Sequence, residues 1–214
     1  MHLSNLDALT AAAALVAVWM CGVTRLQCLF WGLALQTAGI AAVTAMVGME
    51  RHQSSYLLLA LVVALAKAVA IPSFLTRTSD RVGAPKDRGV LLAPPLPLFA
   101  GCGALAMGFF LTESVAGHQA AHPGAAGMAV SLLLIGMLLM LTRRLAISQV
   151  VGFLVLENGI FLYALTQTHG MPLMVEMGVV LDLLVAVMVS GLLIFRLNSS
   201  FEHIDVSKLR RLRH

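Results

Sequence analysis

Long runs of apolar residues, separated by short polar segments, dominate the sequence of this 214-residue chain. Each run is about 17–25 residues long, which is the length of a helix that crosses the hydrocarbon core of a bilayer. None of the runs alternates between apolar and polar residues in the way that the strands of a transmembrane barrel do. The pattern predicts seven membrane-spanning helices, at about residues 8–24, 27–48, 54–76, 90–112, 125–141, 145–167 and 173–196.

Composition agrees with an all-α integral membrane protein. Hydrophobic residues make up 59% of the chain and charged residues only 11%, whereas a soluble domain carries about 25% charged residues. The start of the chain has no basic segment of the kind that begins a signal peptide, so we expect the first apolar run to be a retained helix.

Basic residues are distributed unevenly between the predicted spans. Twelve of the fourteen fall on one side of the membrane: Arg25, Arg77, Arg81, Lys86, Arg88, Arg143, Arg144, Arg196, Lys208, Arg210, Arg211 and Arg213. Cytoplasmic segments are enriched in Lys and Arg. The sequence therefore predicts an outer N-terminus and a cytoplasmic C-terminus.

An internal similarity relates the first three spans to the last three. Gly32 and Gly39-Ile40 in the second span match Gly152 and Gly159-Ile160 in the sixth span, with the same spacing. The two triads would run the same way through the membrane, so the match predicts a parallel three-helix repeat of helices 1–3 and 5–7. Chance similarity between helices rich in Ala, Leu and Val is the alternative.

These features divide the chain into four segments. Residues 1–89 hold helices 1–3 and a cytoplasmic loop, and residues 90–124 hold helix 4 and an outer loop. Residues 125–196 hold helices 5–7. Residues 197–214 form a basic cytoplasmic tail that would bind either anionic lipid headgroups or a cytoplasmic partner.

Three charged residues lie deep inside predicted spans, where an ionisable group costs roughly 2.5–3.5 kcal/mol on insertion scales. They are Lys67 in the third span, Glu157 in the sixth and Asp182 in the seventh. Such groups could handle protons, pair with each other to fix the helix register, or be neutralised by charges on a partner subunit. Asn158 lies beside Glu157, and Glu176 near the outer edge is expected to be a solvated carboxylate.

The sequence contains no motif that indicates catalysis by this chain alone. It has no phosphate-binding glycine loop, dinucleotide-binding fingerprint or Ser/His/Asp arrangement. The histidines lie in loops or near the termini, which does not favour haem ligation. His118 and His122 are four residues apart but lie in a Gly/Ala-rich loop without carboxylates, so we expect no metal site and no cofactor.

Several short motifs resemble a known family of membrane subunits, called hydrogenase-4 component E. They are Leu156-Glu157-Asn158-Gly159, Val175-Glu176-Met177-Gly178, Asp182, Lys67 with Pro72, and Ile204-Asp205-Val206 with Leu209. The resemblance covers nearly the whole chain, including its length and its seven spans.

This resemblance implies a subunit of a membrane-bound hydrogenase or formate hydrogenlyase related to respiratory complex I, in a prokaryotic inner membrane. Its expected partners are antiporter-type membrane subunits and a cytoplasmic arm of hydrogenase and iron–sulfur subunits. Helices 5–7 are similar to the three-helix subunit K of complex I. Glu157 would correspond to the buried glutamate on the second helix of that subunit, and Asp182, which is one methylene shorter, to the glutamate on its third helix.

The sequence leads to one principal hypothesis and two alternatives. The principal hypothesis is a non-catalytic subunit that couples electron transfer to proton or sodium movement through Glu157, Asp182 and Lys67. One alternative is a self-sufficient small transporter with a site between the two repeats. The other is a structural anchor that joins the arm to larger membrane subunits.

Overall fold

The computed structural model describes residues 2–82, 95–116 and 122–167, and every regular element in these ranges is a helix. The elements are α1 (His2–Gly22), α2 (Leu26–Glu50), α3 (Ser54–Val62), the π-helical segment η1 (Val63–Ala70), α4 (Ile71–Val82), α5 (Leu96–Ala116), α6 (Pro123–Thr142) and α7 (Ala146–Gln167). The segments α3, η1 and α4 follow each other without a break and form the third span. Six helices are therefore long and apolar enough to cross a membrane in the described part of the chain.

These six helices lie at the first six predicted spans. Three helix ends differ from the prediction by six residues, and one of them is the end of the third span, which continues to Val82 and not to 76. The fourth helix begins at Leu96 and not near residue 90, because Pro95 and Pro97 suit the start of a helix. The carbonyl of Pro95 accepts the first helical hydrogen bonds from the amides of Leu98 and Phe99. The first helix begins at His2, earlier than predicted. The predicted span 173–196 and the tail 197–214 lie outside the described residues.

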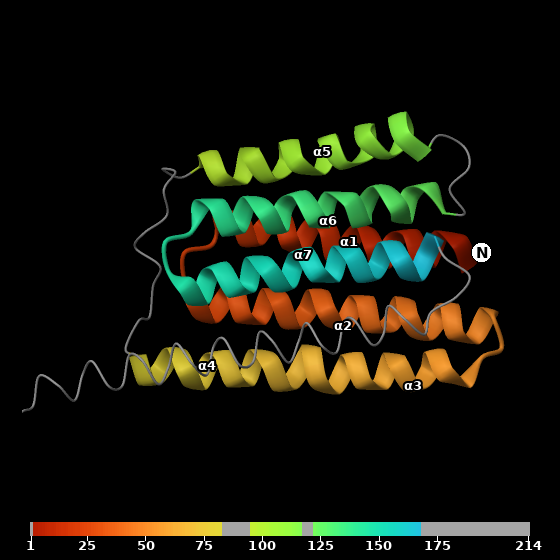
Figure 1. Cartoon of the computed structure of the whole chain (residues 1–214), viewed down its shortest axis with the longest axis horizontal. Helices are drawn as coiled ribbons and strands as arrows, with labels where there is room; N and C mark the ends of the chain where they lie inside the picture. The colour runs from red at the N-terminus through yellow and green to blue at the C-terminus, as the bar shows by residue number, and fades with distance from the viewer. Residues whose placement is uncertain (1, 83–94, 117–121, 168–214) are drawn as a thin grey trace, which may run out of the picture.

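The helices pack side by side with nearly parallel axes (Figure 1). Four of them make a central group in which α1 contacts α2 and α6, and α7 contacts α6 and α2. Helix α5 covers α6 and α1 on one side, and the third span lies along α2 on the other. Helix α2 therefore separates most of the third span from α7.

Glycines allow two helix pairs to approach closely, and they do so at matching positions. A Cβ atom on Gly32 of α2 would lie 2.7 Å from the Met20 side chain of α1, and one on Gly152 of α7 would lie 2.8 Å from the Met140 amide of α6. Gly152 lies 120 residues after Gly32, and Met140 lies 120 residues after Met20. The contact at the first glycine of the predicted repeat is therefore shared. The second differs, because a Cβ atom on Gly39 would lie 4.0 Å from Ala13, whereas one on Gly159 would lie 2.8 Å from Leu133.

Glycines also bring α6 and α7 into close backbone contact. A Cβ atom on Gly136 would lie 2.5 Å from the amide nitrogen of Leu156, and one on Gly159 would lie 2.8 Å from that of Leu133. Small residues of this kind let helices associate in lipid through backbone-to-backbone packing. Helices α6 and α7 therefore form a rigid pair that carries Glu157.

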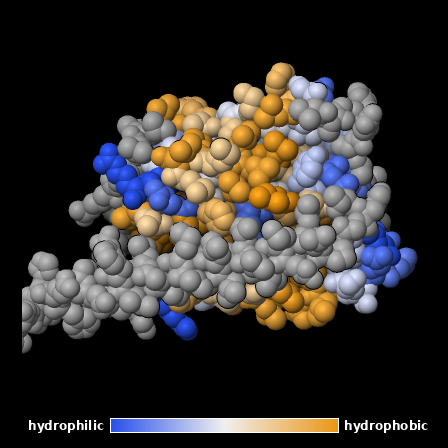
Figure 2. All heavy atoms as spheres, in the orientation of Figure 1, coloured by the Kyte–Doolittle hydropathy of each residue, from blue (hydrophilic) through white to orange (hydrophobic). Residues whose placement is uncertain are grey.

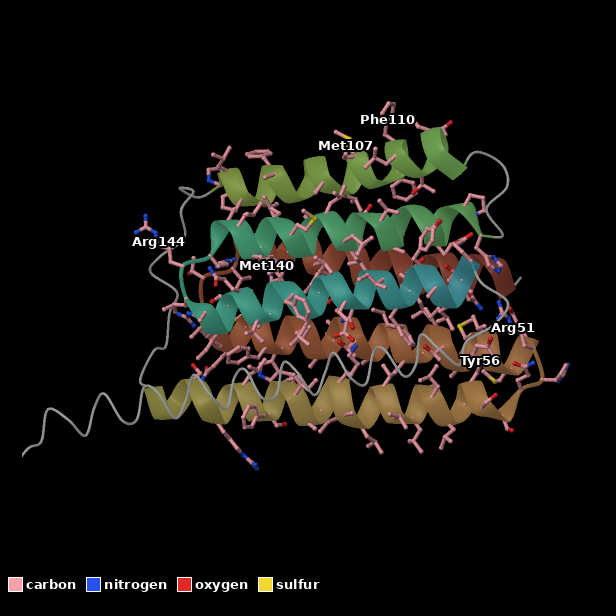
Figure 3. All side chains as sticks on the ribbon, in the orientation of Figure 1. Arg51, Tyr56, Met107, Phe110, Met140 and Arg144 are labelled. Atoms are coloured by element: carbon pink, nitrogen blue, oxygen red, sulfur yellow. The ribbon has the colours of Figure 1, made fainter. Side chains whose placement is uncertain are left out.

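The outer surface and the helix ends have the character of a membrane protein. Large apolar side chains of α5 and the third span are exposed, among them Phe99, Phe110, Leu58 and Leu65, and Figure 2 shows broad hydrophobic areas on one face. The turns after α1 and α6 lie at the same end of the bundle as the end of α4, and Figure 3 places Arg144 at this end and Arg51 at the other. This arrangement agrees with the predicted charge asymmetry.

Replacing Gly136 by Ala is expected to lower the thermal stability of the chain in detergent. The new methyl group must push the α7 backbone away, at about 1–3 kcal/mol, and about 1 kcal/mol shifts the melting temperature of a chain of this size by roughly 2–4 °C. Gly103→Ala is the matched control, because nothing in the described structure lies within 4 Å of the added Cβ atom. Equal melting temperatures for the two variants would contradict the close α6–α7 packing.

Candidate functional site: a buried ion pair with a polar neighbourhood

Lys67 lies in the π-helical part of the third span. Pro72 follows it by five residues, and a proline inside a helix removes one backbone donor and crowds the carbonyl four residues before it. A wider π turn is one way in which a helix accommodates such a break, and these turns are frequent at functional sites. The segment η1 ends at Ala70, two residues before Pro72. The proline therefore accounts for the irregular backbone around Lys67.

Glu157 lies in the middle of α7 and forms an ion pair with Lys67. The Nζ atom of Lys67 is 2.7 Å from Oε1 of Glu157. Lys67 is 7% exposed and Glu157 is 4% exposed, so both charges are shielded from the surroundings. The structure thus brings together two of the three charges that the sequence identified inside spans, from positions 90 residues apart.

The ion pair settles one question that the sequence left open. Of the three expectations for the buried charges, pairing within the chain is what the structure contains for Lys67 and Glu157. Replacing a buried pair by apolar residues often costs no stability, so its presence is weak support for a purely stabilising role. Asp182 and Glu176 lie outside the described residues.

Asn158, the neighbour of Glu157, connects α7 to α2. Its Nδ2 donates to Oγ1 of Thr37 at 3.0 Å and to Oε1 of Gln36 at 3.5 Å, the second contact being long and weak. Asn158 is 2% exposed, and Gln36 and Thr37 are buried as well. A set of neutral polar groups therefore lies at the contact between α2 and α7, one residue along α7 from Glu157.

Sequence reasoning missed Gln36 and Thr37, because it searched the spans for charged residues. The available signal was an amide and a hydroxyl side by side near the middle of an apolar run. Polar side chains inside spans hydrogen-bond across helices. The same search applied to neutral polar residues would have selected this position.

Sequence reasoning also treated Arg143 only as a charge that sets the orientation of the chain. Arg143 is 2% exposed, and its Nη2 donates to the carbonyls of Met20 at 2.9 Å and Cys21 at 3.0 Å. These carbonyls belong to the last turn of α1, where the helix has unpaired acceptors and a partial negative charge. Arg143 therefore caps α1 and ties it to the α6–α7 turn.

The chemistry of this site follows from its donors and acceptors. A carboxylate and an ammonium group can exchange protons, and their positions fix where a charge can reside inside the bundle. Among the described residues, no group of three His, Cys, Asp or Glu side chains could hold a metal ion. The site is thus an arrangement of charges and hydrogen bonds inside the bundle.

Comparison with known proteins identifies one informative relative. The chain is 34% identical over 186 residues to a protein of Mycobacterium tuberculosis (strain ATCC 25618 / H37Rv) described as "Uncharacterized protein Rv0085". The alignment covers 85% of this chain and 83% of the mycobacterial protein. No family model and no solved structure matches the chain.

Removing one member of the ion pair should destabilise the chain more than removing both. Lys67→Met or Glu157→Leu alone leaves a buried ionisable group without its 2.7 Å partner, which costs about 3–5 kcal/mol, whereas the double variant removes both charges. Thermal unfolding of the three variants in detergent measures this coupling. A double variant whose loss equals the sum of the single losses would contradict the ion pair.

Arg143→Gln should lower the thermal stability, because it removes two hydrogen bonds from a charged donor, each contributing about 1.5–3 kcal/mol. The adjacent Arg144→Gln is the control, since Arg144 is exposed and carries the same charge. If both arginines served only to orient the chain, the two variants would unfold at the same temperature.

Proposed function

The chain belongs to the family of the uncharacterized mycobacterial protein Rv0085, and we propose that it is a non-catalytic membrane subunit of a complex I-like hydrogenase or formate hydrogenlyase. Its helices would cross the prokaryotic inner membrane seven times, with the N-terminus outside and the C-terminus in the cytoplasm. Antiporter-type membrane subunits and a cytoplasmic hydrogenase and iron–sulfur arm would be its partners. The electron chemistry would take place in that arm, and this chain would itself catalyse no reaction.

In this proposal the chain takes part in moving protons, or sodium ions, across the membrane. The observation that carries the proposal is the Lys67–Glu157 pair, because it is buried in apolar helices and links two spans that are distant in the sequence. A charge that arrives near either residue would change the attraction between them, since Coulomb interactions are strong where water is excluded. Glu157 would then gain or release a proton, with Asp182 as the next acidic group.

The resemblance described from the sequence supports this assignment, since it implies that Glu157 and Asp182 correspond to buried acids of complex I subunit K. Two rival functions make different predictions. A self-sufficient transporter would move ions as a purified chain in liposomes. A structural anchor would need the ion pair for assembly of the complex and not for ion movement.

Glu157→Gln and Asp182→Asn should each lower ion movement in inverted membrane vesicles that contain the assembled complex. The amide keeps the size of the side chain but can no longer bind and release a proton. The measurement is the number of ions moved per hydrogen turned over, with pH-sensitive and sodium-sensitive dyes. Glu113→Gln is the control, because Glu113 is exposed at the end of α5.

Two outcomes would reject the proposed role. Unchanged coupling in both acid variants would show that the carboxylates do not take part. Loss of the complex from the membrane, without loss of coupling in the remaining complex, would favour the anchor. Purification in a mild detergent tests the partners directly, and recovery of the chain alone would count against a subunit role.

A further inference from the structure

Helix α2 carries two buried polar residues, Gln36 and Thr37, that apolar packing alone does not explain. Gln36 is 0% exposed, and its Nε2 has no hydrogen-bond partner among the described residues. Exchanging the two ends of its amide group would only leave the oxygen in that position, since the two orientations are nearly indistinguishable in shape. A buried polar atom without a partner destabilises a protein. An apolar side chain of the same size would suit this position better for stability alone.

Thr37 differs from six other threonines of the described helices. Thr10, Thr44, Thr76, Thr112, Thr142 and Thr166 each donate their hydroxyl to a carbonyl three or four residues earlier in the same helix. The recorded hydrogen bond of Thr37 instead joins it to Asn158 on another helix. By the 120-residue offset between the two helix pairs, Thr37 is also the counterpart of Glu157. The two halves thus place a neutral and a charged group at the same position.

The contacts of Asn158 with Gln36 and Thr37 fix the rotation of α7 about its own axis relative to α2. Adjacent residues of an α-helix point about 100° apart, so fixing the direction of Asn158 also fixes the direction of Glu157. Helix α2 contacts α3, η1 and α4 along the third span, as well as α7. It is therefore the common support of the segment that holds Lys67 and of the helix that holds Glu157.

We propose that Gln36 and Thr37, acting through Asn158, are positioning residues that hold Glu157 against Lys67 in the geometry required for ion movement. This inference rests on the proposed function. Neither residue needs to carry an ion. Their task is to keep the carboxylate at 2.7 Å from the ammonium group, and a misplacement of about 1 Å in such an arrangement can lower a rate by roughly 100-fold.

The test uses the assembled complex in inverted vesicles and measures ions moved per hydrogen turned over. Thr37→Val removes the hydroxyl but keeps the shape of the side chain, and it should lower the ratio, because Glu157 would no longer be held against Lys67. Thr37→Ser keeps the hydroxyl and should restore most of the ratio. Thr44→Val is the matched control, because Thr44 is buried on the same helix but donates its hydroxyl to the Ile40 carbonyl of that helix.

Gln36→Met separates a positioning role from a structural one. The thioether fills the space of the amide without a buried polar atom, so thermal stability should be unchanged or higher. Coupling should nevertheless fall, because Asn158 loses one of its two acceptors on α2. Unchanged coupling in both Gln36→Met and Thr37→Val would overturn the inference.

The same variants in a Glu157→Gln background show whether the effect passes through the carboxylate. If Thr37 acts by positioning Glu157, then Thr37→Val should cause no further loss in this background. A further loss of similar size would overturn the inference and indicate a general structural defect. If Glu157→Gln alone leaves coupling intact, this inference fails, and the proposed function fails with it only if Asp182→Asn also leaves coupling intact. A loss of coupling in Glu157→Gln with normal coupling in Thr37→Val rejects only the positioning role.

Discussion

A charge inside an apolar bundle must be compensated, and the rest of this structure is arranged around that requirement. Lys67 and Glu157 compensate each other at 2.7 Å, although α2 lies between most of the third span and α7. Their contact requires that the lysine side chain reach past α2 and that α7 turn its carboxylate toward it. The ion pair thus couples three helices that apolar packing alone would hold together only loosely, since lipid tails are as apolar as the side chains.

The two sides of this pair have different mechanical properties. Glu157 belongs to a helix that packs backbone to backbone on α6 through Gly136, Gly152 and Gly159. Lys67 belongs to a π-helical segment next to Pro72, in a span whose side chains are mostly exposed. The carboxylate is therefore held by a rigid support, and the ammonium group by a support with an irregular backbone.

Prediction from the sequence succeeded for features that depend on local composition. The apolar runs identified six of the described helices, and the glycine spacing pointed to Gly32 and Gly152, which make close contacts at equivalent positions of two helix pairs. Prediction failed where the role of a residue depends on distant neighbours. Arg143 follows an apolar run, as do arginines that set the orientation of a membrane protein. Its guanidinium nevertheless donates hydrogen bonds to carbonyls in the last turn of α1, more than 100 residues away in the sequence.

The sequence by itself determined which segments suit a bilayer and which charges lie inside the apolar helices. These properties depend on the free energy of transferring each side chain into hydrocarbon. That free energy is set mainly by the type of residue and not by its partners in the fold. The tertiary structure decided the partners: Lys67 with Glu157, Asn158 with Thr37, and Arg143 with the end of α1. Partners depend on how the helices pack and rotate about their axes, and this is set by contacts between residues that are far apart in the chain.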